Sequence, residues 1–285
     1  PEDQTGTKVT FLPDETIFTE TTVFDFDILK SRLREMAFLT KGLHIILRDN
    51  RVTEEPREEN LTEEGKENTE KSPDLSTEKE QEKKQISQLL ERAQPVKKQK
   101  VVEFHYEGGI KEFVAYLNKS KTPIYDNILY FEGEKNNVYV EVSFQHNDSY
   151  NESVFSFVNN INTPEGGTHL QGFRNALTKT FNDYARNAKL LKDSEPNLSG
   201  EDIREGLTAI ISVKIEDPQF EGQTKQKLGN SEARGAVDSI VSEQLTYFLE
   251  LNPAIAKAIC EKSILAQRAR EAARKPAISM SSFSS

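Results

Sequence analysis

Residues 209–215 read Ala209-Ile210-Ile211-Ser212-Val213-Lys214-Ile215 and form the most apolar of the strands that the sequence predicts. A short apolar run of this length, rich in β-branched residues, is typical of a buried strand. Asp217-Pro218 then turns the chain into a polar loop that contains Gly222-Gln223-Thr224-Lys225. A lysine and an amide at the tip of such a loop can reach a phosphate that another domain holds. This loop is therefore the first candidate site.

Two long helices are predicted after the loop. Ser231 is placed to cap the first helix, whose apolar residues recur at helical spacing from Val237 to Phe248. Asn252-Pro253 breaks that helix, and a second helix runs to about Lys275.

The part of the chain before residue 209 predicts strands and helices in mixed order. Asp25 is placed to cap an early helix, and Thr168-x-x-Gln171 matches a capping box at the start of a later one. Lys135-Asn136-Asn137 predicts the turn of a hairpin. The predicted strands are 7–12, 43–47, 101–106, 128–131, 138–144 and 154–158, and the predicted helices are 26–37, 110–117 and 170–184. This order predicts an α+β fold.

Composition limits the class of protein. The chain has 285 residues, a formal net charge of −10 and a mean hydropathy of −0.66, so we expect part of it to add nothing to a core. Its one cysteine, Cys260, excludes a disulfide framework and a cysteine-rich zinc site, and we expect it to be a small inert residue on one face of a helix. No run of about 18 apolar residues predicts a membrane span, so we expect a cytoplasmic protein with no membrane partner.

Charge is uneven along the chain. Residues 53–82 hold twelve acidic and four basic side chains, a net charge of −8. We expect residues 52–99 to be an acidic, largely disordered insertion, because so few apolar side chains cannot offset the entropic cost of ordering. Residues 254–275 carry a net charge of +4. The sequence therefore predicts a basic C-terminal helix over 252–275 and a frayed tail over 276–285.

The sequence holds no motif for a metal site or an acyl-transfer site, so we assign no catalytic and no metal-binding residue. Gly166-Gly167 before a helix fits a phosphate cradle, but a structural turn is favoured because the expected capping box satisfies the same amides. Spacing alone favours a solvated lysine at Lys225. The basic residues of the final helix fit contact with DNA phosphates and stabilisation of a helix C-terminus equally well.

Several segments together resemble the transducer domain of DNA gyrase B subunits, which are type IIA DNA topoisomerases. The resemblance covers about residues 5–51 and 100–275. The segments that carry it are Thr5–Phe11, Arg32–Leu39, His105–Ile110, Tyr116–Lys119, Gly166–Arg174, Arg204–Leu207, Gln223–Lys225 and Ala269–Arg274.

The resemblance implies a fold and a division into domains. It implies that residues 1–22 end a GHKL-type ATPase domain, and that residues 23–51 and 100–251 form a ribosomal protein S5 domain 2-like transducer fold with a long C-terminal helix. It also implies a fragment of an ATP-hydrolysing topoisomerase that couples ATP binding and hydrolysis to DNA strand passage and supercoiling.

The resemblance assigns roles to individual residues. Gln223 and Lys225 match residues that contact the γ-phosphate of ATP, and Thr7 matches a threonine of the adenine pocket. The candidate DNA-facing residues of the basic helix are Arg268, Arg270 and Arg274. The implied cofactors are ATP and Mg²⁺. The implied partners are DNA, the gyrase A protein and a second copy of the gyrase B protein, in a nucleoid-associated enzyme of the cytoplasm.

The sequence also departs from the family pattern. The upstream ATPase motifs and the downstream metal-binding motifs of the family are absent from it, so we expect this chain alone to bind ATP weakly and neither to hydrolyse ATP nor to relax DNA. A topoisomerase IV B protein, which shares the fold and the loop, is the first alternative, although Tyr106–Gly109 and Tyr116–Lys119 favour gyrase. The second alternative is a non-enzymatic DNA-binding or assembly fragment.

Overall fold

The structure is a computed structural model that describes residues 5–53 and 98–274. Most of the predicted acidic insertion (54–97) and the predicted frayed tail (276–285) lie outside the described residues. The chain divides into two compact units, of which the larger comprises residues 1–45 and 104–285 and the smaller comprises residues 46–103.

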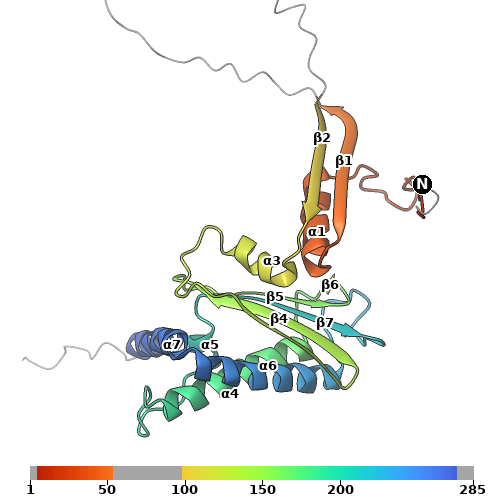
Figure 1. Ribbon diagram of the computed structural model, residues 1–285. Helices are drawn as coiled ribbons and strands as arrows, with labels where there is room; N and C mark the ends of the chain where they lie inside the picture. The colour runs from red at the N-terminus through yellow and green to blue at the C-terminus, as the bar shows by residue number, and fades with distance from the viewer. Residues whose placement is uncertain (1–4, 54–97, 275–285) are drawn as a thin grey trace, which may run out of the picture. The chain divides into compact units, whose positions relative to one another are not determined.

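The larger unit is built on a five-stranded mixed sheet with the order β3-β4-β7-β5-β6 (Figure 1). Its strands are β3 (Leu129–Lys135), β4 (Val138–His146), β5 (Ser153–Val158), β6 (Ile161–Asn162) and β7 (Leu207–Ile215). β7 is the central strand, antiparallel to β4 and parallel to β5. A parallel pair needs a long crossover connection, and helix α4 (Thr168–Asn187) lies in the connection between β5 and β7.

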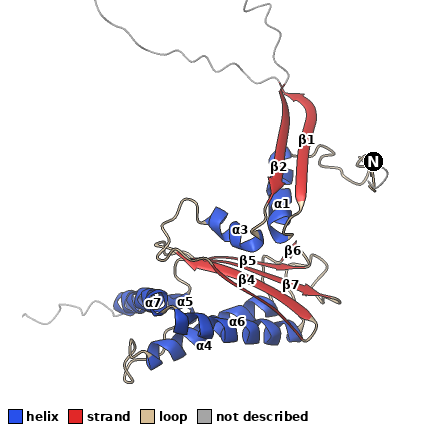
Figure 2. Cartoon of the chain, in the orientation of Figure 1, coloured by secondary structure: helices blue, strands red, loops and turns tan. Residues whose placement is uncertain are grey.

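The apolar run at 209–215 forms β7 because the sheet buries it on both faces. Ala209, Ile211 and Val213 belong to the main core, which also holds residues of α4 and of α6 (Ser231–Leu251). Ile210 belongs to a second cluster, with residues of α1 (Phe26–Leu39) and α3 (Gly109–Leu117). Figure 2 shows α4 and α6 on one side of the sheet and α3 on the other. The predicted buried strand is confirmed.

The two long helices at the end of the chain are also confirmed. α6 ends at Leu251, and α7 begins at Pro253 and runs to Arg274; a proline is well tolerated at the first helical position, where its missing N–H would have no partner. Cys260 of α7 is buried, and burial raises the pKa of its thiol to about 12. Among the described helices, none has the length and apolar composition that spanning a bilayer requires.

The predicted strand at 7–12 is wrong. These residues have no regular structure, and the side chains of Val9 and Phe11 are 78% and 72% exposed. A strand needs a neighbour to accept and donate its backbone hydrogen bonds, and within 5–53 and 98–274 none of the named strands pairs with this segment.

The strands on either side of the predicted insertion are longer than their sequences indicate. β1 (His44–Thr53) and β2 (Lys98–His105) form a two-stranded sheet. Residues 52–53 and 98–99, which we assigned to the insertion, therefore lie in strands. Apart from Val52 the residues from 48 to 53 are polar, as are Lys98 and Gln99, so the apolar pattern stops before the strands do.

The N-cap of α1 is as predicted, whereas the N-caps of α4 and α6 differ from the prediction. The Asp25 carboxylate accepts a hydrogen bond from the Ile28 N–H at 2.8 Å, as predicted. The capping box at Thr168 and Gln171 is wrong, because the N-cap of α4 is Gly167, with φ +129° and no side-chain cap. Asn230, rather than Ser231, is the N-cap of α6.

Helices α4 and α6 pack against each other at Gly172, where a side chain has no room. A Cβ on Gly172 would lie 2.4 Å from the carbonyl oxygen of Arg234. We expect Gly172→Ala to lower the free energy of unfolding by about 2 kcal/mol, since overpacking forces the helices apart. Gly235→Ala is the matched control, because a Cβ there meets nothing within 4 Å. Equal denaturation midpoints for the two variants would contradict this packing.

Candidate functional site

The loop between β7 and α6 forms a narrow hairpin, residues 219–229, which we call the hairpin loop. Phe220 and Leu228 pair in an antiparallel bridge. The Glu221 N–H donates to the carbonyl of Lys227 and the Gly229 N–H donates to the carbonyl of Gln219, both at 2.8 Å. These backbone bonds hold the stem of the hairpin and leave its tip, residues 222–225, outside the ladder.

Asn230 fixes the base of the hairpin loop. Its Oδ1 accepts a hydrogen bond from the Gln219 N–H at 2.6 Å, and its Nδ2 donates to the carbonyl of Asp217 at 3.2 Å. The side chain is only 4% exposed. An asparagine amide offers a donor and an acceptor together, so this one residue closes both sides of the turn that follows β7.

The tip places the predicted contact residues in solvent. Gly222 has φ +86°, and Lys225 has φ +55°, a left-handed conformation that costs a non-glycine residue about 1 kcal/mol or more. Gln223, Thr224 and Lys225 are all exposed. The Lys225 ammonium lies 5.9 Å from the centroid of the Phe220 ring, a distance that allows a weak cation–π attraction.

The two lysines of the hairpin loop differ in their partners. Lys227 Nζ lies 2.9 Å from Glu221 Oε2, and this hydrogen-bonded ion pair raises the pKa of Lys227. Lys225 forms no ion pair with any carboxylate in the part of the chain that the structure describes. Its charge is therefore available to an anion that approaches the tip, whereas the charge of Lys227 is already paired.

Thr7 is not brought to this loop. It is exposed, in the irregular segment described above. No hydrogen bond or ion pair joins Thr7 to Gln223 or Lys225 among the described residues. Its role in an adenine pocket stays a prediction.

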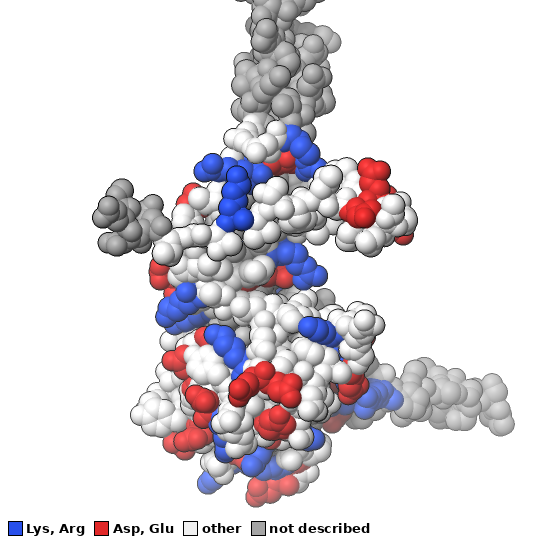
Figure 3. All heavy atoms as spheres, turned by 90° about the vertical axis from the view of Figure 1, so that its right-hand side faces the viewer, with Lys and Arg blue, Asp and Glu red and all other residues white. Residues whose placement is uncertain are grey.

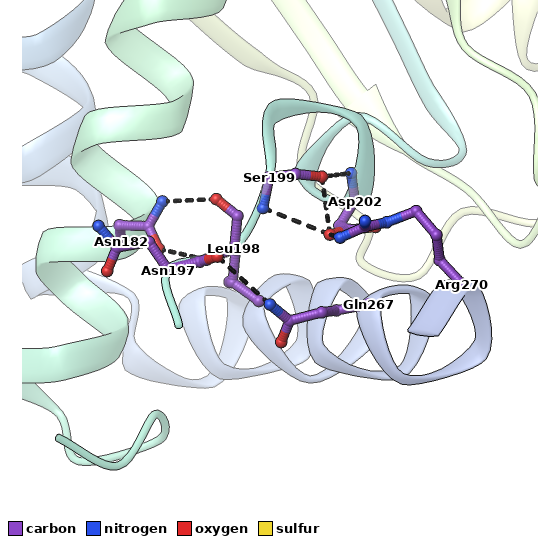
Figure 4. A network of polar contacts seen from close by, with 7 residues as sticks. All are labelled: Asn182, Asn197, Leu198, Ser199, Asp202, Gln267 and Arg270. Carbon is purple, nitrogen blue, oxygen red and sulfur yellow. Dashed lines mark hydrogen bonds and ion pairs between the residues drawn. The ribbon is translucent and has the colours of Figure 1, made fainter. Parts of the chain in front are cut away.

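The three arginines of the basic helix have different surroundings. Arg270 donates two hydrogen bonds to the carboxylate of Asp202, at 2.9 and 2.7 Å (Figure 4). Arg268 is 66% exposed and lies 3.8 Å from Glu195, and Arg274 is exposed near the end of α7. The guanidinium of Arg270 is turned toward α5 (Gly200–Ile203) and is held there by a buried acid, and the assignment of Arg270 as DNA-facing stays a prediction.

Asp202 is a residue that the sequence analysis missed. It is 3% exposed and accepts a hydrogen bond from the Ser199 hydroxyl at 2.7 Å. The two reciprocal backbone bonds of a capping box join the same two residues. The pattern Ser199-x-x-Asp202 matches that motif and could have been found in the sequence. Gln267 adds a second polar contact from α7, to the carbonyl of Asn197 at 3.3 Å (Figure 4). Polar contacts therefore fix the C-terminal half of α7 to the body.

The glycine turn before α4 is structural rather than a phosphate cradle. The Thr168 N–H at the helix start already donates to the carbonyl of Leu228 at 3.1 Å. His169 is fully buried, and burial lowers its pKa to about 4, so it is neutral. Arg174 is paired with Glu152 at 2.8 Å.

Neither the distribution of charged side chains nor the grouping of metal-binding side chains indicates a second site among the described residues. Figure 3 shows acidic and basic side chains interspersed over one face of the larger unit, without a continuous basic area among the described residues drawn there. No group of three or more His, Cys, Asp or Glu side chains that could hold a metal ion occurs in the described ranges.

Comparison with known proteins places the chain among the B-type proteins of bacterial DNA topoisomerases. The DNA gyrase B protein of Halalkalibacterium halodurans is 49% identical over 96% of this chain and 36% of the relative. The DNA topoisomerase 4 B protein of Staphylococcus epidermidis is 49% identical over 95% of this chain and 34% of the relative. A crystal structure of the 43K ATPase domain of Thermus thermophilus gyrase B matches with a TM-score of 0.66 and 35% identity, over 92% of this chain and 58% of that one.

The family model for DNA gyrase B matches residues 109–277, more than half of the chain. The chain belongs to the DNA gyrase B family. It spans 36% of the length of the gyrase relatives from H. halodurans and Clostridium acetobutylicum.

Proposed function

We propose that this chain is the transducer segment of a longer gyrase B protein, and that its hairpin loop senses the γ-phosphate of ATP. The observation that carries the proposal is the exposed tip of the loop, where Lys225 has no carboxylate partner among the described residues while Lys227 is paired with Glu221. The similarity to a gyrase ATPase domain from T. thermophilus supports ATP as the ligand. In this proposal residues 1–22 end the ATPase domain, and residues 23–51 with 100–251 form the S5 domain 2-like transducer.

The side chains at the tip suit a phosphate that is present in the ATP state and absent after hydrolysis. A lysine ammonium is a point charge that binds phosphate oxygens without a fixed fork geometry, and the Gln223 amide adds two donors. ATP presents one more phosphate than ADP, so the loop gains a favourable contact only in the ATP state. Hydrolysis removes that contact and shifts the population of loop positions.

The described residues fit the phosphate of ATP better than they fit Mg²⁺. Lys225 and Gln223 would contact the γ-phosphate, and the Thr7 hydroxyl would line the adenine pocket. The described residues offer no cluster of carboxylates for the metal, so in the proposal Mg²⁺ is held by another part of the full-length protein. When bound, ATP supplies the free energy of phosphoryl transfer.

The whole enzyme is proposed to act on DNA, with the gyrase A protein and a second copy of the gyrase B protein as partners. Arg268, Arg270 and Arg274 of α7 are the proposed contacts to DNA, and of these Arg270 is also bound to Asp202. The equally similar topoisomerase 4 relative keeps the alternative of a topoisomerase IV B protein. ATP-dependent supercoiling of relaxed circular DNA by the full-length protein with its gyrase A partner would support gyrase, and strong decatenation without supercoiling would support topoisomerase IV.

The proposal that this chain supplies only part of the ATP site is tested by comparing the 285-residue chain with the full-length protein. We expect the chain alone to show no ATP hydrolysis above background and weak ATP binding, because the loop supplies only the contacts to the last phosphate. The full-length protein is expected to hydrolyse ATP. Steady-state phosphate release measures both, and robust turnover by the chain alone would contradict the assignment.

A further inference from the structure

The stem of the hairpin loop runs beside the turn that starts α4. Three backbone hydrogen bonds join them: the Glu165 N–H donates to the carbonyl of Gln226 at 3.1 Å, the Leu228 N–H to that of Gly166 at 3.0 Å, and the Thr168 N–H to that of Leu228 at 3.1 Å. Gly167 and Leu228 form a parallel bridge. We call the paired segments 165–168 and 226–228 the junction.

The junction depends on the lack of a side chain at Gly167. Its φ of +129° is a conformation that residues with a side chain rarely adopt. A Cβ built there would lie 2.3 Å from the carbonyl oxygen of Leu228 and 2.5 Å from its nitrogen. The two backbones therefore touch directly, and a displacement of Leu228 is passed to Gly167 without a flexible side chain between them.

The junction continues into the core on both sides. Leu228 is fully buried in the main core cluster. On the α4 side, His169 Nε2 lies 3.1 Å from the Thr163 hydroxyl, which donates to the carbonyl of Ser156 in β5 at 2.9 Å. The same segments thus connect the hairpin loop to the first turn of α4 and to the sheet.

Two polar atoms at the start of α4 have no hydrogen-bond partner within the described residues. They are Thr168 Oγ1 and His169 Nδ1, and both are buried. In the described part of the chain, the backbone bonds of the junction thus hold Thr168, whose hydroxyl adds no bond of its own.

We propose that the junction transmits the state of the hairpin loop to α4, and that Gly167 is the positioning residue of this transmission. The inference rests on the proposed function, since the ligand that moves the loop is the γ-phosphate of ATP. Coupling is reciprocal: a ligand that orders the loop orders the junction, and a defect in the junction weakens the response of α4 to that ligand. Gly167 itself touches no nucleotide.

Hydrogen exchange in the full-length protein tests the inference. In the unmodified protein, a non-hydrolysable ATP analogue is expected to slow exchange roughly tenfold in the hairpin loop and at the amides of Thr168 and Leu228. Gly167→Ala is expected to keep the slowing in the loop and to lose it in the first turn of α4. Gly235→Ala is the matched control, and we expect it to behave like the unmodified protein.

The outcomes separate the inference from the proposed function. Equal slowing at α4 in Gly167→Ala and in the unmodified protein would overturn the role of the junction while leaving the loop as a sensor. No effect of the analogue on the hairpin loop of the unmodified protein, at saturating concentration, would overturn both.

A second variant covers the case in which Gly167→Ala does not fold. Thr163→Val keeps the shape of the side chain and removes the hydroxyl that His169 and Ser156 share. We expect it to fold, with a reduced melting temperature, and to lose most of the effect of the analogue at α4 while keeping that in the loop. An effect at α4 of unchanged size would contradict the proposal.

Discussion

Lys225→Ala is expected to lower the ATP turnover of the full-length protein by roughly 10²-fold, the usual effect of removing one charged or hydrogen-bonding contact to a reacting group. Lys225 forms no ion pair within the described ranges, so its loss removes the proposed contact to the γ-phosphate and leaves no buried partner behind. Lys227→Ala is the matched control on the same loop. It removes an exposed ion pair with Glu221, which contributes little to stability, and turnover is expected to stay within about twofold.

The measurement is the steady-state rate of ATP hydrolysis at saturating ATP, with DNA binding measured separately without nucleotide. DNA affinity is expected to be unchanged in Lys225→Ala, because the candidate DNA contacts lie on α7. Similar turnover in the two lysine variants would remove the distinction on which the assignment of Lys225 rests. A parallel loss of DNA affinity would show a general defect instead of a nucleotide-specific one.

Arg270→Ala is expected to lower the melting temperature of the 285-residue chain by roughly 5–10 °C. The carboxylate of Asp202 is 3% exposed and receives two hydrogen bonds from Arg270, so the substitution leaves a buried charge without its partner. Arg270→Lys should be intermediate, since an ammonium cannot reproduce the two-pronged contact. Arg268→Ala is the control, because its contact at 3.8 Å is exposed, and a change of less than about 1 °C is expected.

The same pair predicts a dependence on pH. Burial acts to raise the pKa of Asp202, but the hydrogen bonds from Arg270 and Ser199 outweigh it and hold the pKa below its ordinary value of 3.8. A lowered pKa in the folded state means that the pair stabilises the protein above about pH 4 and that this contribution is lost as the pH falls through the lowered pKa. Melting curves between pH 6 and pH 2 should therefore converge for Arg270→Ala and the unmodified chain. A constant difference across that range would contradict the ion pair.

Local chemistry made much of the fold predictable from the sequence. The strand at 209–215 was predicted because a short apolar run rich in β-branched residues is typical of a buried strand. The hairpin of β3 and β4 was predicted from its turn, where Asn136 and Asn137 adopt φ of +54° and +59°, a conformation that asparagine tolerates. Pro253 indicated the boundary between α6 and α7, because a proline in the interior of a helix removes a backbone hydrogen bond.

The features that sequence reasoning missed depend on partners far away in the chain. Asp202 and Arg270 are 68 residues apart, and nothing local to Arg270 distinguishes it from Arg268 or Arg274. Gly167 was recognised as a turn residue, but its contact with Leu228 follows from the way α4 packs beside the hairpin loop. The segment 7–12 has a strand-like sequence and no partner strand in the described part of the chain, so its pattern was misleading.

The sequence predicted where the exposed loop lies, but it did not predict the contacts that its side chains make. The polar composition of 222–225 indicated an exposed loop, and the structure confirms the exposure of Gln223 and Lys225. The difference between Lys225 and Lys227 could not be predicted, because it depends on the hairpin register that sets Glu221 opposite Lys227.

The chemical reactivity of the Lys225 amine tests the central claim most directly. The full-length protein is treated with a lysine-acylating reagent, and mass spectrometry compares Lys225 with Lys227 in the nucleotide-free protein, with ADP and with a non-hydrolysable ATP analogue. A ligand at about ten times its dissociation constant should protect a contacting amine roughly tenfold. We predict that the ATP analogue protects Lys225, that ADP does not, and that Lys227 reacts equally in all three states. Equal reactivity of Lys225 with the analogue and with ADP would contradict the account.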